Sequence, residues 1–569
     1  MSPTIYTFPI STCSSEFIYD YHACALAINQ QIKCWGRNNG NLGYGDTEER
    51  GDELNEIGDY LPFVPIQDII SVSTGRIVTC AYLSSLQVKC WGGNAFGQLG
   101  QESTNIIGND PNELGDYLPP IDFGTGVSVS YLHSSYDHSC VITSSNDLKC
   151  WGYNESGRLG YGDTASRGNG ANEMGNYLTA VDLGTSEKAR SITLGEEFTC
   201  ALLVSGYAKC WGKGTSGQLG QEDTFTKGNW VNELGDNLPP IDLGPGLVVS
   251  KIFSGYDHNC ALFDDQTVKL WGNNDDGQLG IGSTSDKGDD PKEMGTYLST
   301  SNLGTSRTVL EVCLGESHSC MILDNFELKC FGQGDYGQLG YGDNADRGDG
   351  SGEMGDNLPN VNVGSGLTSE SIHCGKHNTC VIFNDDSFKC WGINGNGQLG
   401  QGDTQSRGND PNELGDYLPP INLGTGFEIQ ECFDYSPSSS PTFTLSPSYQ
   451  PSFQPTLFPS QSFMPTLNPS TISPSLSLSP TQSPTFGVHF LGGDQNGGGD
   501  SDEIYEMVVD SDGSVIVGGD SDSDPLFGFA NKGNSDFFMA KYRSNLTFYW
   551  GWSNGSSSND YGLMIFCCF

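Results

Sequence analysis

The chain has 569 residues, which is enough for more than one domain. Its formal net charge is −44, from 26 basic and 70 acidic residues, and this charge argues against nucleic acid as a direct partner. The chain has 77 Gly, is 11% aromatic and has no run near the roughly 18 apolar residues of a membrane span, so we expect an all-β protein without a transmembrane segment.

From about residue 13 to residue 433 the sequence repeats itself. The tripeptide Cys-Trp-Gly, or a close variant, occurs seven times, and its glycines are spaced by 56 residues once and then by 60 residues. Most copies continue with x-N-x-x-G-Q-L-G, G-D-T-x-x-R-G and N-E-L/M-G-D-x-L-P. These glycines are Gly36, Gly92, Gly152, Gly212, Gly272, Gly332 and Gly392. A fixed period of this length indicates a repeat architecture.

Each repeat contains a predicted β-hairpin before the tripeptide. In the fourth copy, residues 200–210 form an apolar stretch with Ser205-Gly206 at its centre, which predicts strand, turn and strand. With flanking strands, each unit supplies about four strands and cannot bury its own faces, whereas seven units stacked radially can.

The ends of the repeat favour a closed ring over a solenoid, which would also explain the period. Residues 424–433 repeat the start of a unit and then stop, so we expect a final strand that completes the first blade. The predicted fold is all-β, a seven-bladed β-propeller of about 60-residue repeats within residues 1–434.

The repeated motifs resemble those of the regulator of chromosome condensation repeat family. The units G-x-x-H-S-C-x-I/L and W-G-x-N-x-x-G-Q-L-G-x-G-D are clear at residues 315–323 and 391–403, and the resemblance covers about three quarters of the chain. It implies a seven-bladed propeller. That family includes a nuclear nucleotide-exchange factor for the small GTPase Ran, bacterial inhibitors that bind an enzyme with one propeller face, and many interaction modules, so fold alone does not choose a function.

Three features argue against exchange activity. The chain has no basic tail, the 60-residue step leaves no blade a long insertion, and acidic residues recur in every unit instead of gathering in one. No nucleophile elbow, Walker loop or H-E-x-x-H motif occurs, so we expect no enzyme. The sequence predicts a non-catalytic scaffold that recognises a protein or a glycan. Two alternatives stay open: an exchange factor for a Ran-like small GTPase, and an inhibitor that caps a partner enzyme.

Six of the seven units carry two cysteines ten residues apart, among 19 cysteines in the chain. The predicted hairpin places the two opposite each other, and a disulfide there would close a short loop and contribute about 2–3 kcal/mol. We also expect Cys13 and Cys432, at the two ends of the ring, to lock its closure. The predicted pairs are Cys24 with Cys34, Cys80 with Cys90, Cys140 with Cys150, Cys200 with Cys210, Cys320 with Cys330 and Cys380 with Cys390.

The fifth unit departs from this pattern, because Cys260 faces Leu270. This exception keeps open the alternative that the cysteines are buried packing residues without disulfides. The cysteines without an assigned role are Cys260, Cys313, Cys374, Cys567 and Cys568.

Recurring polar and aromatic residues are interpreted as structural. Four histidines occupy the same position in different blades, so we expect each to hydrogen-bond a neighbouring strand and not to bind a metal. The acidic loops could offer oxygen ligands to calcium. Most of these loops also contain a basic residue, so we expect the carboxylates to pair with it inside the loop, and we expect no cofactor. The histidines are His22, His138, His258 and His318, and the repeat tryptophans, expected between blades, are Trp35, Trp91, Trp151, Trp211, Trp271 and Trp391.

Trp230 breaks the repeat, because it replaces an Asp or Gly of the corresponding loops. An aromatic residue on an exposed loop is a candidate binding anchor, and a locally packed loop residue is the alternative.

Two further segments follow the repeat. Residues 435–486 carry no charge and a proline every four to six positions, which predicts a disordered Pro/Ser/Thr linker that reaches on the order of 150 Å. Residues 487–569 resemble a bacterial-type β-propeller repeat, with strands expected near 510–519 and 536–542 and the opening of a second copy at 550–562. A single repeat and a fraction cannot close a ring, so we expect a partial repeat, with two alternatives: the segment is unstable alone, or it is truncated and belongs to something longer.

The cysteine pairs and the linker together predict an extracellular or cell-surface location. Ser/Thr-rich proline segments are typical of O-glycosylated stalks, and N-glycosylation sequons begin at Asn154, Asn545 and Asn554. Residues 1–17 show no basic stretch followed by an apolar core, so no signal peptide is visible. The cytoplasm or the nucleus is the alternative location, with a plain disordered linker.

Overall fold

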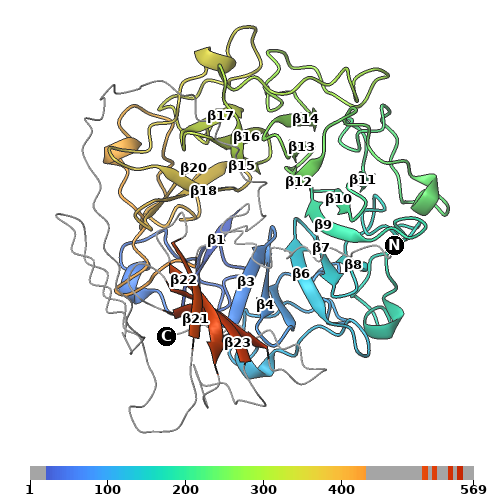
Figure 1. The fold of residues 1–569 in the computed structure, drawn as a ribbon, viewed down its shortest axis with the longest axis vertical. Helices are drawn as coiled ribbons and strands as arrows, with labels where there is room; N and C mark the ends of the chain where they lie inside the picture. Colours follow the sequence, from blue (N-terminus) through green and yellow to red (C-terminus); the bar gives the residue numbers. More distant parts are fainter. Residues whose placement is uncertain (1–20, 431–502, 510–514, 522–535, 543–547, 555–569) are drawn as a thin grey trace, which may run out of the picture. The chain divides into compact units, whose positions relative to one another are not determined.

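The structure, a computed structural model, describes residues 21–430 and four strands of the tail. Residues 21–430 form seven small antiparallel sheets that follow one another around a ring in chain order (Figure 1). This is the seven-bladed β-propeller that the repeat predicts. Every helix among the described residues is a single three-residue 3-10 turn, and none could cross a membrane.

A complete blade has an inner, a middle and an outer strand (Figure 1). The inner strands are β3 (Ile69–Thr74), β6 (Val129–Ser134), β9 (Ala189–Leu194), β12 (Val249–Ser254), β15 (Val309–Leu314) and β18 (Ser369–Cys374). The middle strands are β1 (His22–Leu26), β4 (Val78–Leu83), β7 (His138–Thr143), β10 (Phe198–Leu203), β13 (His258–Phe263), β16 (His318–Leu323) and β19 (Asn378–Phe383). The outer strands are β2 (Ile32–Gly36), β5 (Val88–Gly92), β8 (Leu148–Gly152), β11 (Ala208–Gly212), β14 (Val268–Gly272), β17 (Leu328–Gly332) and β20 (Phe388–Gly392).

Alternation along the middle strands builds the core between blades. In β10, Cys200 and Leu202 pack with the next blade, whereas Ala201 and Leu203 pack with the preceding one. Successive side chains of a strand point to opposite faces of the sheet, so a strand that is apolar at every position suits a blade covered on both sides. The core is therefore a series of apolar layers, one at each interface between blades.

The sequence predicts about four strands in each unit, and this prediction is wrong by one strand. After the outer strand the chain returns to it only at a single bridge, as between Gly152 and Arg167. The next residue, Gly168, has φ of +93°, so the backbone turns away and the pairing stops. A 3-10 turn follows in six blades: η1 (Gly58–Tyr60), η2 (Gly115–Tyr117), η3 (Gly175–Tyr177), η4 (Gly235–Asn237), η5 (Gly355–Asn357) and η6 (Gly415–Tyr417).

The first blade is closed by the end of the repeat. Its sheet has only β1 and β2, and Ile429 bridges to Ala27 beside β1. The Ile28 N–H donates to the Glu428 carbonyl at 3.0 Å, and the Gln430 N–H donates to the Leu26 carbonyl at 2.8 Å. The predicted closure of the ring by the end of the repeat is confirmed, although among the described residues this end forms an isolated bridge and not the expected strand. Ile429 is buried with residues of the first and last blades.

The repeat tryptophans connect neighbouring blades, as predicted. The Trp211 indole is fully buried and donates to the Arg158 carbonyl of the preceding blade at 3.0 Å. Trp35 makes the corresponding bond to the Gln398 carbonyl at 3.0 Å, which joins the first blade to the seventh. In the sixth unit Phe331 takes this place and fills the same layer without a donor.

The tail contains one four-stranded antiparallel sheet in the order β21-β22-β23-β24. The strands predicted near 510–519 and at 536–542 correspond to β22 (Val515–Ser521) and β23 (Asp536–Tyr542). The sequence did not predict β21 (Glu503–Val509) as a strand. The segment interpreted as a second copy contributes β24 (Phe548–Asn554), which pairs with β23 in the same sheet.

Candidate binding face

The six predicted cysteine pairs are disulfides in the structure. Each joins register partners on the middle and outer strands of one blade, with Cα atoms 4.0–4.1 Å apart. The turn of each hairpin therefore fixes which cysteines meet. These disulfides join Cys24 to Cys34, Cys80 to Cys90, Cys140 to Cys150, Cys200 to Cys210, Cys320 to Cys330 and Cys380 to Cys390.

The fifth blade has no hairpin disulfide, as its sequence predicts. Cys260 of β13 pairs in register with Leu270 of β14 and is a buried free thiol. Burial raises the pKa of this thiol far above its usual value, so the sulfur stays protonated and packs as an apolar group. The alternative of a cysteine that serves only for packing therefore applies to this blade and not to the other six.

A seventh disulfide among the described residues joins two blades and was not assigned from the sequence. It links Cys313 of β15 to Cys374 of β18, 61 residues apart. In other blades the corresponding positions are bridged by a hydrogen bond, as where the Ser254 N–H donates to Thr193 Oγ1 at 2.9 Å. The disulfide thus takes the place of a hydrogen bond that links neighbouring inner strands in other blades.

The four recurring histidines connect blades through their ring nitrogens, which confirms their structural interpretation. His258 Nε2 lies 3.0 Å from Ser319 Oγ of the next blade, and His22 Nε2 lies 2.9 Å from Thr79 Oγ1. Burial lowers the pKa of His22, His258 and His318 to about 3, so these rings are neutral in the folded protein. His138 and His318 make the same contact with Thr199 and Thr379.

The acidic loops are self-paired, as predicted. Arg167 forms an ion pair with Asp163 at 2.7 Å, four residues earlier, and most other loops repeat this pair. The recurring glutamate caps the loop from inside: Glu173 Oε2 accepts the backbone N–H groups of Asn169 and Gly170 at 2.9 and 2.8 Å. The carboxylates of this loop thus accept hydrogen bonds from an arginine and from backbone N–H groups of the same loop.

Trp230 is exposed on the loop after β11, where its side chain is 70% accessible. Its neighbours Phe225 and Val231 are 68% and 74% accessible, and the Lys227 ammonium lies 5.2 Å from the centre of the Phe225 ring. This exposure does not fit the alternative of a locally packed residue. The predicted role of Trp230 as a binding anchor stays a prediction.

The glycosylation site predicted at Asn154 is wrong. Its side chain is fully buried, and its amide donates to the carbonyls of Asp163 and Ala165 at 2.9 and 3.0 Å. The same Asn accepts the Leu159 N–H at 2.9 Å, so it organises the loop and cannot carry a glycan in the folded blade. Asn554 ends β24, with no described side chain. The remaining predictions outside the described residues concern the linker, Asn545, Cys13, Cys432, Cys567 and Cys568.

The turns between inner and middle strands gather at the centre of one end of the ring. Backbone hydrogen bonds lock neighbouring turns together: the Glu196 N–H donates to the Tyr256 carbonyl at 3.1 Å, and the Glu316 N–H donates to the Lys376 carbonyl at 3.0 Å. These turns and the residues beside them form what we call the central face. We call the turns themselves the inner turns: residues 75–77, 135–137, 195–197, 255–257, 315–317 and 375–377.

The middle residue of the inner turn varies among the blades, in contrast to the recurring side chains between blades, such as Trp211 and His258, which we call the frame. The Arg76 guanidinium lies 4.6 Å from the centre of the Tyr136 ring, and the Tyr136 and Tyr256 rings meet edge to face at 6.0 Å. The Lys376 ammonium lies 5.4 Å from the centre of the Tyr256 ring, two blades away. Aromatic and charged groups from four blades therefore meet at the centre. The six middle residues are Arg76, Tyr136, Glu196, Tyr256, Glu316 and Lys376.

Ion pairs hold the rest of the central face. Glu316 accepts from Lys376 Nζ at 3.3 Å and from His377 Nε2 at 2.8 Å. Burial acts to raise the pKa of Glu316, but the His377 bond and the Lys376 charge outweigh it and lower the pKa below its usual value. Lys213 lies 3.8 Å from Asp257, whose pKa is raised by burial.

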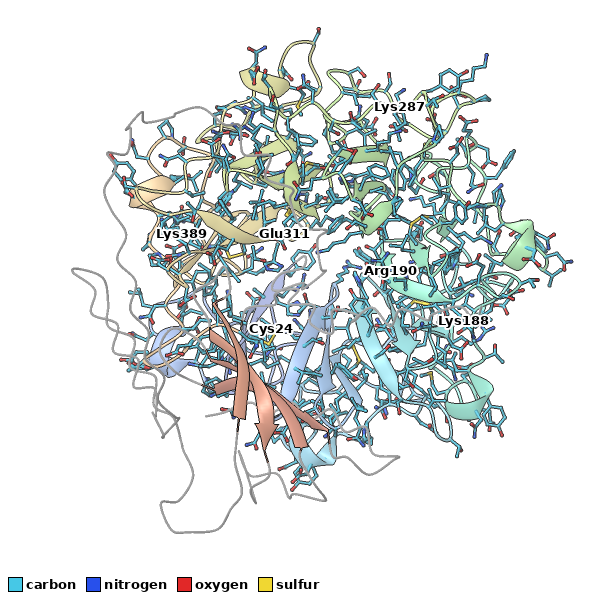
Figure 2. The ribbon with its side chains drawn as sticks, in the orientation of Figure 1. Cys24, Lys188, Arg190, Lys287, Glu311 and Lys389 are labelled. Carbon is cyan, nitrogen blue, oxygen red and sulfur yellow. A yellow bond between two sulfur atoms is a disulfide. The ribbon has the colours of Figure 1, made fainter. Side chains whose placement is uncertain are left out.

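The inner strands continue the polar character below the central face. Arg190 of β9 and Glu311 of β15 lie near the centre of the ring (Figure 2). Glu311 accepts the Ile372 N–H at 3.2 Å and the Ser371 hydroxyl at 3.3 Å, which ties the sixth blade to the seventh. The Ser371 hydroxyl also lies 3.1 Å from His373 Nε2, so Glu311, Ser371 and His373 form one hydrogen-bonded polar group on the inner strands.

The central face was not predicted from the sequence, although the sequence contains a signal for it. In an alignment of the units with one another, the position of Arg76, Glu196 and Lys376 varies in charge, whereas the residue before it is Gly or Ser in the six units with an inner turn. A consensus sequence of the repeat keeps the recurring residues and therefore shows no residue type at this position. Variation at these neighbouring positions of a regular repeat is the signal that could have found the central face.

A ring of seven such blades with one variable central face defines a propeller of the regulator of chromosome condensation type. The family model described as the RCC1-like domain matches residues 31–428, which is most of the chain. The chain therefore belongs to the RCC1-like domain family.

Three similar proteins illustrate the range of this family. The Ultraviolet-B receptor UVR8 of Arabidopsis thaliana is 25% identical over 373 residues, with 57% of this chain and 78% of UVR8 covered. The mitochondrial RCC1 domain-containing protein RUG3 of the same plant is 27% identical over 319 residues, with 55% of this chain but only 64% of RUG3 covered. The crystal structure of Prp20p from Saccharomyces cerevisiae, reported with its binding properties to Gsp1p and histones, matches with a TM-score of 0.53 at 20% identity and covers 71% of this chain and 88% of Prp20p. At that identity the likeness shows the fold alone.

Proposed function

We propose that this protein is a non-catalytic binding scaffold whose propeller recognises a protein or glycan ligand through its central face. The observation that supports this proposal is the change of the middle inner-turn residue from blade to blade on a uniform frame. Tyrosine and arginine beside paired charges are the side chains that protein interfaces favour. A protein is therefore the first class of ligand to test, and a glycan is the second.

Export from the cell is part of the same proposal. Six hairpin disulfides and one disulfide between blades support folding in an oxidising compartment. The Pro/Ser/Thr segment 435–486 would hold the propeller away from a cell surface as a glycosylated stalk. Alkylation of the native protein without reduction, followed by peptide mapping, tests this part: about a dozen protected cysteines in pairs ten apart support export, and 19 reactive cysteines after unfolding reject it.

Binding is tested with the full chain, produced in an oxidising compartment and screened on arrays of extracellular proteins and glycans. We expect a ligand whose binding is lost in Tyr256→Ala and Lys376→Glu, which change the central face, and is retained in Trp230→Ala, which changes the exposed loop. Loss of binding only in Trp230→Ala would move the binding site to that loop and overturn the proposal for the central face.

The two alternative functions are tested with the same protein. An exchange factor would accelerate nucleotide release from a Ran-like small GTPase, and we expect no acceleration. An inhibitor would form a tight one-to-one complex that blocks the active site of a partner enzyme. Either positive result would replace the exported scaffold with that more specific function.

A further inference from the structure

Two disulfides of the sixth and seventh blades lie against each other. Cys313, Cys320 and Cys330 are register partners across β15, β16 and β17, so their side chains form one row on one face of the sixth blade. Cys320 is bonded to Cys330, and Cys313 is bonded across the interface to Cys374. The sulfurs of Cys313, Cys320 and Cys374 all lie within 4.8 Å of one another.

Among the complete blades, only the sixth has a cysteine at the inner-strand position of this row. The repeat therefore does not require a third cysteine here, and its presence brings a second disulfide into reach of the first. The residues at the position of Cys313 in the other complete blades are Ser73, His133, Thr193, Phe253 and His373.

The disulfide between blades is also the most accessible one among the described residues. Cys374 is half-buried and lines the hollow at the central face, together with Tyr256, Glu316 and Lys376. The cysteines of the six hairpin disulfides are at most 3% exposed. A thiolate must approach a disulfide sulfur to react with it, so Cys374 is the sulfur that an external thiol reaches first.

We propose that Cys374 is a thiol-exchange site for a small external thiol, and that the cysteine row passes the exchange on. The thiolate of the external thiol attacks Cys374 Sγ, forms a mixed disulfide there and releases Cys313 as a thiolate. The Cys313 thiolate then attacks Cys320 Sγ, forms the Cys313–Cys320 disulfide and releases Cys330 as a thiolate. Each step forms one sulfur–sulfur bond and breaks one, so the external thiol is the single co-reactant: it ends in the mixed disulfide, and one protein thiolate is released for it.

The site lies where exchange would alter the central face. Cys374 directly precedes the inner turn that begins at Gly375, and Cys313 lies two residues before the turn that begins at Gly315. These two turns carry Lys376 and Glu316, which pair at 3.3 Å. Opening the disulfide removes the covalent link between the strands that position this pair. The proposal concerns the chemistry of the row and does not depend on the identity of any ligand.

The test uses the intact full-length protein with reduced glutathione as the probe. Samples are alkylated after increasing times without denaturant, and peptides are mapped by mass spectrometry. We expect the first glutathione adduct on Cys374, with the first free thiol on Cys313 or Cys330, at least ten times faster than any modification of Cys200 or Cys210. A first adduct in another blade, or equal rates at all pairs, would overturn the proposal, because equal rates indicate global unfolding.

The relay step has its own variant and control. In the double variant Cys320→Ser with Cys330→Ser, the glutathione adduct still forms on Cys374, but the released thiol stays on Cys313. In the double variant Cys200→Ser with Cys210→Ser, a matched pair in the fourth blade, the wild-type pattern persists.

The wild-type protein decides the relay step even if the first variant does not fold. A Cys313–Cys320 peptide in its time course supports the relay. The absence of that peptide at times when Cys374 is already modified rejects the step.

Discussion

The frame between blades and the central face follow opposite rules, although the same seven repeats build both. In the frame one residue type recurs, as with Trp211 and His258, and each side chain contacts the next or preceding blade. On the central face the recurring position holds Arg76, Glu196 or Lys376, with no common chemistry. Repetition is useful where every interface must close the same ring, and variation is useful where one surface must discriminate.

The frame and the central face also differ in how much they contribute to the free energy of unfolding. Frame side chains are fully buried, so their loss leaves cavities or unpaired polar groups. Central-face pairs such as Lys376 with Glu316 are partly solvated, and such pairs contribute little to stability. Substitutions in the frame should therefore lower stability more than substitutions on the central face.

The largest effect is expected from Trp211→Ala. The indole is fully buried and bonds the Arg158 carbonyl, so its removal should cost about 3–5 kcal/mol of unfolding free energy. Trp230→Ala is the matched control, because its indole is 70% exposed, and it should change stability by less than about 0.5 kcal/mol. Denaturant unfolding followed by circular dichroism measures both, and similar losses in the two variants would contradict the separation of frame from exposed loop.

Removal of a hairpin disulfide should have the next largest effect. The double variant Cys200→Ala with Cys210→Ala opens a loop with a sequence separation of 10 and should cost about 2–3 kcal/mol. Cys260→Ala, in the blade whose cysteine is free, serves as the control that removes a buried sulfur without removing a crosslink. Denaturant unfolding of both proteins without reductant gives the comparison. Equal losses would show that packing of the sulfur, and not the crosslink, carries the stability.

How far the sequence predicts this molecule depends on whether a feature lies within one repeat. The pairing of Cys200 with Cys210, the histidine contacts and the Arg167–Asp163 pair were all predicted, because each follows from local spacing or from recurrence. The number of strands in a blade was not predicted correctly, because only the backbone of the folded loop shows that strand pairing ends at Gly168.

Contacts between residues of different blades could not be predicted from the sequence. Cys313 and Cys374 are 61 residues apart, and nothing in their spacing shows that two inner strands place them together. The sequon at Asn154 misled for the reverse reason: its motif is local, but the folded loop buries the amide. The central face lies between these cases. The differences among its residues can be read from the sequence, but the fact that they meet at the centre of the ring is known only from the structure.

Acid should weaken the frame through its histidines. Burial lowers the pKa of His258 to about 3 from 6.5, so the folded ring stays neutral while the unfolded ring gains a proton below pH 6.5. The contribution of this histidine is fully present above that pH and is lost as pH falls toward 3. In His258→Gln the fall in unfolding free energy between about pH 6 and 4 should be shallower by about 1.4 kcal/mol per pH unit.

Denaturant unfolding of wild type and His258→Gln at a series of pH values measures this effect. Near pH 8, well above the pKa of the unfolded ring, the difference between the two proteins should no longer change with pH. Parallel curves in the acid range would show that His258 is protonated in the folded state.

The smallest stability effect should come from the central face itself. Lys376→Ala removes a partly exposed ion pair with Glu316 and should change the unfolding free energy by less than about 1 kcal/mol. Lys188→Ala removes an exposed ion pair between Lys188, directly before β9 of the fourth blade, and Asp147, in the turn between β7 and β8 of the third blade. Lys188 lies away from the centre of the ring (Figure 2). The two variants should be equally stable, yet only Lys376→Ala should weaken binding of the ligand found on the arrays. A loss of several kcal/mol in Lys376→Ala would place this residue in the frame, because a partly solvated ion pair contributes about 1 kcal/mol at most.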